Sequence, residues 1–298
     1  MPPQLLALIR MSRAYFLPMA ALPYFVGVAV AGRELDQIDS RLMLAGLGIE
    51  LLVQLSVSYF NDYWDMPTDA INTRRTLLSG GSGELTTGVL PPLIAPIMGA
   101  LCQGGALGLA LWAGLPPVGW PLLVLAMAAA VFYTAPPLAL AWRGLGEITT
   151  ATVAGLMVPM WGYSLQTGHL SAEVLVLGLP LVPIIMSMFV AIATPDYEAD
   201  HRVGKRTLPV LVGEGRVASV YAVLAGLGYL AAVSLWWGRV PPGVLIAAAL
   251  CIPLAVWAWW GLRTPISTAP RALLFMIMRA ALIPAVVLVA LNIGLRTG

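Results

Sequence analysis

The chain has 298 residues, of which 59% are hydrophobic and only 10% are charged, and its formal net charge is +2. Because a soluble domain carries about 25% charged residues, this composition indicates an integral membrane protein that contacts a lipid bilayer. The small and dispersed positive charge excludes a nucleic-acid partner. Cys102 and Cys251 both lie in apolar runs, so no disulfide framework or thiolate metal site is expected.

A membrane-spanning helix needs about 20 mostly apolar residues. Nine windows qualify, at 14–32, 42–63, 91–113, 117–134, 147–166, 172–194, 217–237, 242–262 and 273–295. The first window ends in Ala29-Val30-Ala31, which resembles a signal-peptidase site, but it is long enough to be a retained helix. We therefore expect an all-α integral membrane protein, one domain over residues 1–298, with nine transmembrane helices around a central cavity.

The positions of Arg and Lys predict the orientation of these helices. With nine spans and a cytoplasmic N-terminus, most of the 16 basic residues fall on the inner side, namely Arg10, Arg13, Arg74, Arg75, Arg143, Arg202, Lys205, Arg206, Arg216, Arg263 and Arg271. The outer side receives Arg33, Arg41, Arg239 and Arg296, and Arg279 lies within the last window. We expect a multi-pass protein of the cell inner (cytoplasmic) membrane, with the long connections 64–90 and 195–216 on the cytoplasmic side.

The first of these connections begins with an acidic motif, Asn61-Asp-Tyr-Trp-Asp-Met-Pro-Thr-Asp69. Asp62, Asp65 and Asp69 are spaced i, i+3, i+7, so an unbroken helix would place them on one face, with Asn61 close to Asp65. Proline disfavours a helical conformation in the residue before it. Because of Pro67, we expect the helix to end near residues 64–66 and Asp69 to belong to the loop.

The second connection begins with Asp196-Tyr-Glu-Ala-Asp200. Asp196 and Asp200 are spaced i, i+4 and share a helix face, whereas Glu198 points to the opposite side. Thr194-Pro195-Asp196 also fits an ordinary helix start, with Thr194 as the N-cap and Pro195 in the first turn. For this motif alone, a purely structural explanation stays open.

Clustered carboxylates at a membrane boundary are costly unless a cation neutralises them. Oxygen ligands without neighbouring His or Cys favour Mg²⁺, which typically binds one or two carboxylates together with substrate phosphate oxygens. The basic residues of the two connections are Arg74, Arg75, Arg202, Lys205 and Arg206. We expect the two motifs to face each other across one cavity and to hold Mg²⁺ against a diphosphate.

At this point the sequence resembles the UbiA superfamily of intramembrane aromatic prenyltransferases. The resemblance rests on Asn61 to Asp69, on Asp196 to Asp200 and on Gly204-Lys-Arg-Thr-Leu208, and it covers nearly the whole chain. The loop Ser79-Gly-Gly-Ser-Gly83 and the stretch Arg143-Gly-Leu-Gly-Glu147 look most like the menaquinone branch, which prenylates 1,4-dihydroxy-2-naphthoate.

The resemblance implies Mg²⁺-dependent transfer of a polyprenyl group from a polyprenyl diphosphate to an aromatic acceptor, through an allylic carbocation. It implies that Mg²⁺ is held by Asn61, Asp62, Asp65, Asp69, Asp196 and Asp200, and that the diphosphate is bound by Lys205, Arg206 and Arg143. Asn61 would also contact the substrate, and Asp65 and Asp200 would be essential for catalysis.

Three further residues have two explanations each. Tyr133 could stabilise the cation with its ring or could be an interfacial tyrosine. Glu147 could orient the acceptor or act as a base, or it could be an ordinary helix-start acid. Arg13 could contact the acceptor carboxylate or could anchor the first helix on the positive side of the membrane.

Two alternatives to this function stay open. The first is the same chemistry on 4-hydroxybenzoate, homogentisate, a glycerol-phosphate ether lipid or a chlorin. The second is an ion-coupled transporter, which should carry carboxylates near the bilayer midplane. In this chain, the two acidic motifs lie at the ends of their windows.

Overall fold

The computed structural model describes residues 2–264 and 269–297, and these residues contain helices and no strand. The α-helices are α1 (Pro3–Ser12), α2 (Leu17–Ala31), α3 (Ser40–Trp64), α4 (Met66–Ile71), α5 (Ile94–Ala113), α6 (Gly119–Phe132), α7 (Gly146–Thr152), α8 (Val158–Thr167), α9 (Ala172–Gly178), α10 (Leu181–Ala193), α11 (Tyr197–Val203), α12 (Leu208–Val212), α13 (Val217–Trp236), α14 (Pro242–Leu250), α15 (Ile252–Arg263) and α16 (Pro270–Thr297). A π-helical turn at Val153–Met157 joins α7 to α8.

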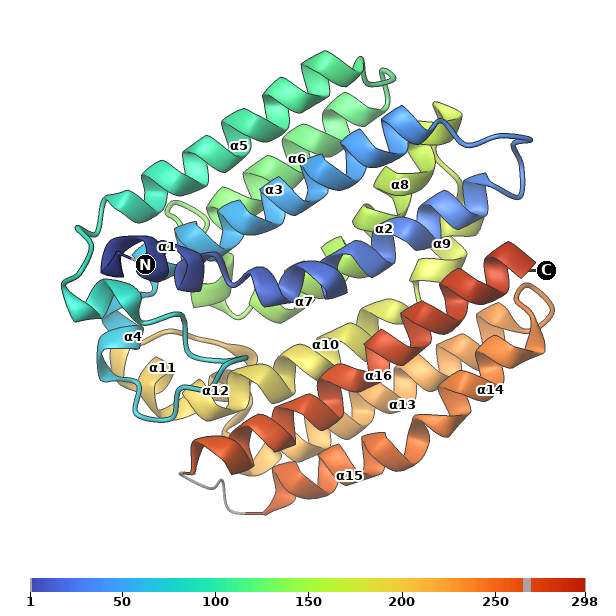
Figure 1. Ribbon diagram of the computed structural model, residues 1–298. Coiled ribbons are helices and arrows are strands. Elements are labelled where there is room, and N and C mark those ends of the chain that lie inside the picture. The colour runs from blue at the N-terminus through green and yellow to red at the C-terminus, as the bar shows by residue number, and fades with distance from the viewer. Residues whose placement is uncertain (1, 265–268, 298) are drawn as a thin grey trace.

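The long helices run roughly side by side in two groups (Figure 1). One group contains α3, α5, α6 and α8, and the other contains α10 and α13 to α16. The helix α2 connects them, because it packs on α8 and α3 in the first group and on α16 in the second. Both N- and C-terminal parts of the chain therefore contribute to the interior between the groups.

Seven helical stretches of the described chain are long and apolar enough to cross a membrane: Pro3–Ala31, Ser40–Trp64, Ile94–Ala113, Ala172–Val203, Glu214–Trp236, Pro242–Arg263 and Pro270–Thr297. They correspond to seven of the nine expected windows. The window 117–134 corresponds to α6, a shorter apolar helix, and the window 147–166 corresponds to α7 and α8, which are not among the seven. An all-helical, multi-pass membrane protein is thus confirmed, with seven spans supported.

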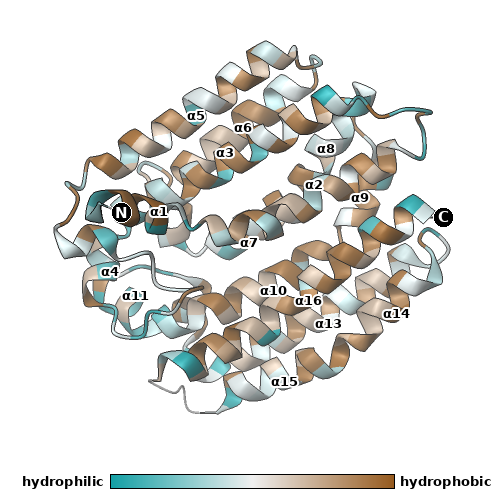
Figure 2. Ribbon diagram, viewed as in Figure 1, coloured by the Kyte–Doolittle hydropathy of each residue, from teal (hydrophilic) through white to brown (hydrophobic). Residues whose placement is uncertain are grey.

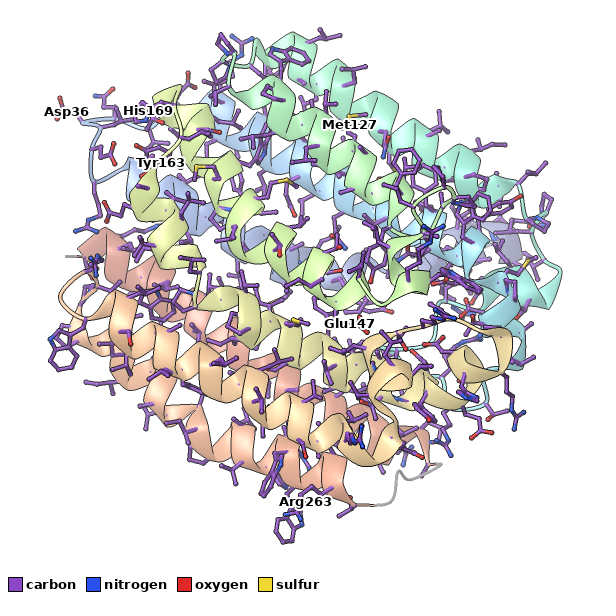
Figure 3. All side chains as sticks on the ribbon, turned by 180° about the vertical axis from the view of Figure 1, so that it is seen from behind. Asp36, Met127, Glu147, Tyr163, His169 and Arg263 are labelled. Atoms are coloured by element: carbon purple, nitrogen blue, oxygen red, sulfur yellow. The ribbon has the colours of Figure 1, made fainter. Side chains whose placement is uncertain are left out.

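Hydropathy follows this arrangement. Hydrophobic residues extend along most of the helices, whereas hydrophilic residues gather in the loops and at the end of the molecule that contains α4 and α11 (Figure 2). The side-chain view places Glu147 between the two groups of helices, with Asp36 and His169 at the opposite end of the molecule (Figure 3). One end of the molecule, where α4 and α11 lie, is thus richer in hydrophilic residues than the long helices.

The close packing of α2 on α8 depends on two glycines. A Cβ atom on Gly27 would lie 1.8 Å from the carbonyl oxygen of Pro159, and one on Gly162 would lie 2.2 Å from that of Tyr24. Small residues let helix backbones approach each other in a membrane, where packing rather than water drives association. This contact holds the first spanning helix against the wall of the interior.

The first acidic motif folds differently from the expectation in one respect. The helix α3 ends at Trp64 with Asp65 as its C-cap, as Pro67 suggested, but a new helix, α4, begins at Met66. Asp69 therefore lies in a helix and is buried, so its assignment to a loop was wrong. The reason is that Pro67 occupies the first turn of α4, where its missing N–H costs nothing.

Candidate functional site

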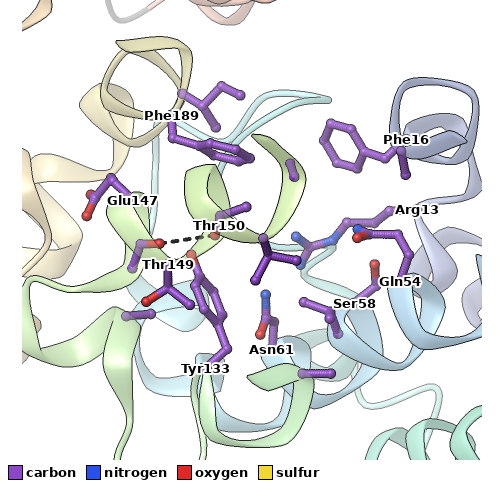
Figure 4. Close-up of a pocket in the computed structure, with 18 of the residues that line it drawn as sticks. Arg13, Phe16, Gln54, Ser58, Asn61, Tyr133, Glu147, Thr149, Thr150 and Phe189 are labelled. Atoms are coloured by element: carbon purple, nitrogen blue, oxygen red, sulfur yellow. Dashed lines mark hydrogen bonds between the residues drawn. The ribbon is translucent and has the colours of Figure 1, made fainter. Parts of the chain in front are cut away.

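The helices enclose a cavity of about 500 Å³, whose wall is mostly apolar along α2, α3, α6, α8, α10 and α16. Figure 4 looks into this cavity, with Phe16 and Phe189 across from Asn61 and Tyr133. Polar residues from distant parts of the chain line it at one end, and these are Arg13, Asn61, Asp65, Asp69, Tyr133, Glu147, Asp196, Asp200 and Lys205. Both acidic motifs therefore face one cavity.

Lys205 joins the two motifs. Its ammonium group donates to Asp65 Oδ2 at 3.0 Å and lies 3.8 Å from Asp200 Oδ1. Asp65 also accepts from the indole of Trp142 at 2.8 Å, and Asp200 accepts from the hydroxyl of Thr207 at 3.1 Å. Although burial lowers the pKa of Lys205, the two carboxylates have the larger effect and raise it, so the ammonium stays charged.

Gly204 explains why Lys205 points back to the cavity. Gly204 has a φ of 78° and ends α11, and the backbone N–H of Lys205 donates to the carbonyl of Asp200 at 2.9 Å. A glycine in the left-handed conformation commonly ends a helix in this way. The chain reverses at this point and places Lys205 beside the acids of its own motif.

Asp62 is buried and lies just outside the cavity lining. Its carboxylate accepts from the guanidinium of Arg13, from the hydroxyl of Ser82 and from the backbone N–H of Ser82. Arg13 itself adopts a left-handed conformation, with a φ of 46°, between α1 and the turn that leads to α2. Asp62 thus connects the N-terminal segment and the loop 79–83, called the glycine-rich loop below, to the end of α3.

The glycine-rich loop lies directly on Asp69. A Cβ atom on Gly81, whose φ is 67°, would lie 1.9 Å from Asp69 Oδ2. Burial raises the pKa of Asp69 to about 8, and the carboxylates of Asp62 and Asp65 add to this increase, while Arg13 and Arg75 oppose it. Burial is thus the main reason why the charged form of Asp69 is costly, and the two neighbouring carboxylates add to that cost.

Asp196 holds the other side of the same loop. Its Oδ1 accepts from the amide of Asn72 at 2.7 Å, and its Oδ2 accepts from the backbone N–H of Gly80 at 3.0 Å.

Thr194 does not cap a helix, because its hydroxyl donates to the carbonyl of Val190 at 2.6 Å in a nearly continuous α10 to α11 segment. The ordinary helix-start explanation for this motif was therefore wrong. Glu198 is exposed and pairs with Arg202, as expected from its opposite direction.

Three more cavity residues lie around the polar end. The side-chain oxygen of Asn61 accepts from Thr134 at 3.1 Å. Glu147 is buried; its Oε1 accepts from the backbone N–H of Leu208 at 3.0 Å, whereas its Oε2 has no hydrogen-bond partner. A Cβ on Gly146 would approach the hydroxyl of Tyr133 to 3.2 Å, so the glycine leaves room for the ring.

Two of the residues predicted to bind diphosphate lie elsewhere. Arg143 and Arg206 are exposed and do not line the cavity, although the backbone N–H of Arg206 donates to Trp142. The structure also adds contacts that the sequence did not predict, namely those of Asn72, Ser82, Trp142 and Thr207. Ser82 belongs to the stretch 79–83 that the sequence analysis singled out as a motif. Nothing in the sequence distinguishes Trp142 from the other tryptophans.

The donor set fits a cation that also binds a ligand. Within residues 2–264 and 269–297, no three His, Cys, Asp or Glu side chains lie where they could together hold a metal ion. However, Asp65, Asp69 and Asp200 line the same end of the cavity, and the buried Asp200 Oδ1 has no hydrogen-bond partner. Oxygen donors with incomplete coordination suit Mg²⁺, which completes its shell with water and phosphate oxygens.

The fold and cavity define a class of protein: a membrane enzyme whose apolar interior ends in a cluster of carboxylates and cations, suited to an amphipathic ligand with an anionic head. The chain belongs to the UbiA prenyltransferase family, whose sequence profile matches residues 20–283. The resemblance inferred from the motifs is confirmed, and so is the class of enzyme, a prenyltransferase.

Two relatives that are named as enzymes share 24% and 29% sequence identity with the chain. It is 24% identical over 229 residues to 1,4-dihydroxy-2-naphthoate octaprenyltransferase of Bacillus subtilis, an alignment that covers 76% of this chain and 72% of that protein. It is 29% identical over 248 residues to lycopene elongase/hydratase of Haloferax volcanii, covering 82% of this chain and 77% of the relative.

Solved structures share the fold. A UbiA homologue from Archaeoglobus fulgidus bound to DMAPP and Mg²⁺ superposes with a TM-score of 0.70 at 17% identity, over 96% of this chain and 99% of that one. Digeranylgeranylglyceryl phosphate synthase superposes with a TM-score of 0.66 at 18% identity, over 99% of both chains.

Proposed function

We propose that this protein transfers a polyprenyl group from an isoprenoid diphosphate to an acceptor in a Mg²⁺-dependent reaction. The observation that carries the proposal is the junction within one cavity of a long apolar interior with a carboxylate and lysine cluster. A prenyl tail fits the apolar part, and a diphosphate with its counter-ion fits the polar end. The related structure bound to DMAPP and Mg²⁺ supports this proposal.

In the proposed arrangement, Asp65, Asp69 and Asp200, with Asn61 and Asp196, hold Mg²⁺ against the diphosphate. Lys205 binds diphosphate oxygens. Bound Mg²⁺ would supply charge stabilisation for the departing diphosphate. Asp62 is also a predicted ligand, although its contacts with Arg13 and Ser82 give it a role in holding the loop. Arg143 and Arg206 are exposed, so they would bind the diphosphate before it enters or after it leaves the cavity.

The chemistry then needs an acceptor carbon and a base. The bond between C1 of the prenyl group and its diphosphate oxygen breaks, and the electron pair leaves with the diphosphate. The ring of Tyr133 faces the resulting allylic cation. An electron-rich carbon of the acceptor forms the new bond, and Glu147, with its unpaired Oε2, accepts the proton that the acceptor loses. On a naphthoate acceptor, the carboxylate would leave as CO₂ instead of a ring proton, and the electron pair of the broken C–C bond would restore the aromatic ring. Glu147 would then orient the acceptor rather than accept a ring proton.

We propose 1,4-dihydroxy-2-naphthoate as the acceptor. The Bacillus subtilis relative supports this choice, as do Arg13 at the cavity wall and the menaquinone-like motifs. A polyene hydrocarbon is the second candidate, because the cavity is mostly apolar and the 29% identical relative is a lycopene elongase/hydratase. The other acceptors considered from the sequence have no comparable support here.

We also propose that α6 and the continuous segment from α7 to α8 cross the membrane, which gives nine spans. The N-terminus then lies in the cytoplasm, and the polar end of the cavity opens toward the cytoplasm from the inner membrane. The excess of Arg and Lys at the expected inner connections supports this orientation.

The purified protein, mixed with geranyl or farnesyl diphosphate, MgCl₂ and each acceptor, tests the function. We expect diphosphate release and a prenylated naphthoate by mass spectrometry, and loss of both when EDTA replaces MgCl₂. Prenylated lycopene without prenylated naphthoate would favour the second candidate. No product with any acceptor, from protein that stays folded, would contradict the proposal.

A further inference from the structure

A row of polar side chains continues from the acidic motif into the apolar part of the cavity. Glu50, Gln54, Ser58 and Asn61 occur at intervals of four, four and three residues along α3, so they share one helix face, and all four line the cavity. We call Glu50, Gln54 and Ser58 the α3 polar row. With a rise of 1.5 Å per residue, Glu50 lies about 16 Å along the helix from Asn61.

The unusual member of the row is Glu50. It lies within the spanning helix Ser40–Trp64, and its Oε2 is buried without a hydrogen-bond partner. A carboxyl group inside a membrane protein is costly unless it is paired, and it marks a functional position by default. No described protein group satisfies that oxygen, so a polar ligand in the cavity beside it would gain a hydrogen bond there.

The opposite wall has a different character. The helices α10 and α16 contribute Ile185, Met188, Phe189, Ala281, Pro284 and Leu288, which carry no hydrogen-bonding side-chain group. Figure 4 shows Phe189 across the cavity from Ser58 and Asn61. The cavity thus has a polar row on α3, beside the apolar Ile49, Val53 and Val57 of the same helix, and it has an apolar wall on α10 and α16 without hydrogen-bonding side chains.

From this asymmetry we infer that the two substrates lie on different walls. The prenyl tail packs on the apolar wall, and the acceptor lies along the α3 polar row, with its hydroxyl groups bonded to Gln54 and Glu50. This inference rests on the proposed function and adds to it the residues that bind the acceptor, which favour a ring with hydrogen-bonding oxygens over a hydrocarbon. Asn61 and Gln54 are about 10 Å apart along the helix, a span suited to a two-ring acceptor.

The charge of Glu50 in this row also determines the orientation in which the acceptor binds. A carboxylate on the ring is disfavoured beside Glu50 and favoured beside Arg13, which lines the polar end. The 4-hydroxyl then points away from the diphosphate, toward Glu50, whereas the 1-hydroxyl, next to the carboxylate on the ring, lies near Gln54. In this direction the ring lies within reach of C1 of the prenyl group at the junction of the two walls.

Steady-state kinetics on two sets of variants test the inference. We expect Gln54→Leu and Glu50→Leu each to raise the KM for 1,4-dihydroxy-2-naphthoate by about fivefold, the effect of losing one hydrogen bond, and to change the KM for farnesyl diphosphate less than twofold. Phe189→Ala, on the apolar wall, should raise the KM for farnesyl diphosphate and change the KM for 1,4-dihydroxy-2-naphthoate less than twofold. Glu50→Gln, which keeps a hydrogen-bonding group, should retain most of the acceptor affinity.

Acceptor binding without turnover gives a second measurement. Quenching of tryptophan fluorescence should show that the wild-type protein binds 1,4-dihydroxy-2-naphthoate more tightly than 2-naphthoate, which lacks the hydroxyl groups, because Trp161 lines the cavity. Glu50→Leu and Gln54→Leu should remove this preference. Since Glu50 Oε2 has no partner to lose, Glu50→Leu should keep the thermal midpoint of the wild type.

Other results would overturn the inference. If the leucine variants raise the KM for the prenyl diphosphate, or shift the preferred tail length, the α3 polar row contacts the tail. Unchanged KM values together with an unchanged preference for the hydroxylated ring would mean that the row contacts neither substrate. Absence of prenyl transfer in the wild type would count against the proposed function instead, and the fluorescence measurement would still decide whether the row binds the ring.

Discussion

At the scale of single residues, Lys205 is the point where the two halves of the site meet. Its Nζ lies 3.0 Å from Asp65 and 3.8 Å from Asp200, which belong to motifs far apart in the sequence. In this arrangement the lysine neutralises carboxylates that would otherwise repel one another. A diphosphate with its cation would bring its own compensating charges, so Lys205 can turn to the diphosphate when Mg²⁺ pairs with the acids.

The carboxylates themselves give the first prediction. Asp65→Asn and Asp200→Asn keep the shape of each side chain but remove its charge, so each should lower the rate of prenyl transfer at least a hundredfold, comparable with losing a preorganised electrostatic contact. Diphosphate release in detergent micelles measures the rate. Glu198→Gln is the matched control, because Glu198 is exposed on the same helix as Asp200 and pairs only with Arg202. Near-normal turnover in both asparagine variants would refute the metal-binding role.

A second residue-scale prediction separates Lys205 from its neighbour. Lys205→Met should raise the KM for the prenyl diphosphate about tenfold or more, since a charged hydrogen bond to the diphosphate is lost, and should leave the KM for the acceptor unchanged. Arg206→Met, at an exposed position outside the cavity, should have a much smaller effect on the same KM. Equal effects of the two variants would show that both cations bind the diphosphate.

The sequence identifies those site residues whose chemistry is unusual for their surroundings. Asp65, Asp69, Asp196 and Asp200 stood out because acids are rare in this chain, and all four line the cavity. Trp142 could not be found in this way, because aromatic residues are common in membrane proteins and only the fold brings its indole to Asp65. The sequence analysis did not single out Glu50, although it is an acid within an apolar window, because only the packing of α3 shows that it faces the cavity.

At the scale of elements, the segment from Asn72 to Gly83 is held at the polar end by carboxylates of both acidic motifs. Asp62 accepts from Ser82 on one side of it, Asp196 accepts from Asn72 and Gly80 on the other, and Arg75 donates to the carbonyl groups of Asp69 and Gly80. Two carboxylates of the acidic motifs are therefore occupied in holding this segment. The carboxylates of Asp65 and Asp200 hold no part of this segment, and Lys205 pairs with both of them.

This element gives the third prediction. Gly81→Ala should lower activity more than tenfold, because the added Cβ would lie 1.9 Å from Asp69 Oδ2, and displacing either group disturbs the polar end. Gly88→Ala is the matched control: its φ of 75° imposes a similar backbone strain, but nothing lies within 4 Å of the added atom. Prenyl transfer and the thermal midpoint should be measured for both variants. If they lose activity equally, backbone strain rather than the contact with Asp69 explains the loss.

Element boundaries show where sequence reasoning reaches its limit. Pro67 correctly indicated that α3 ends before it, but proline is equally suited to the first turn of a new helix, which is what α4 forms. Thr194 and Pro195 suggested a helix start, yet the chain continues from α10 through a short 3₁₀ turn into α11. In both cases the local pattern permits two conformations, and packing around the cavity selects one.

At the scale of the whole molecule, the cavity needs helices from both groups, so its shape depends on how many segments cross the membrane. Seven segments meet the length and hydropathy expected of a span. The helix α6 has 14 residues and would extend about 21 Å, less than the hydrocarbon core. However, its residues Leu122, Leu123 and Ala126 line the cavity beside α3, so one face of this helix contacts protein, whereas Val124 and Leu125 are exposed on the other. A short span is acceptable at such a position.

The last prediction concerns this topology. In a protein whose Cys102 and Cys251 have been replaced by serine, single cysteines should be introduced at four exposed positions, Pro117, Arg143, His169 and Arg202. A membrane-impermeant maleimide should label Arg143→Cys and Arg202→Cys only from the cytoplasmic face, and Pro117→Cys and His169→Cys only from the outer face. Labelling of Pro117→Cys and Arg143→Cys from the same face would show that α6 does not cross. Because Arg143 and His169 bracket α7 and α8, labelling of these two from one face would exclude that second crossing independently.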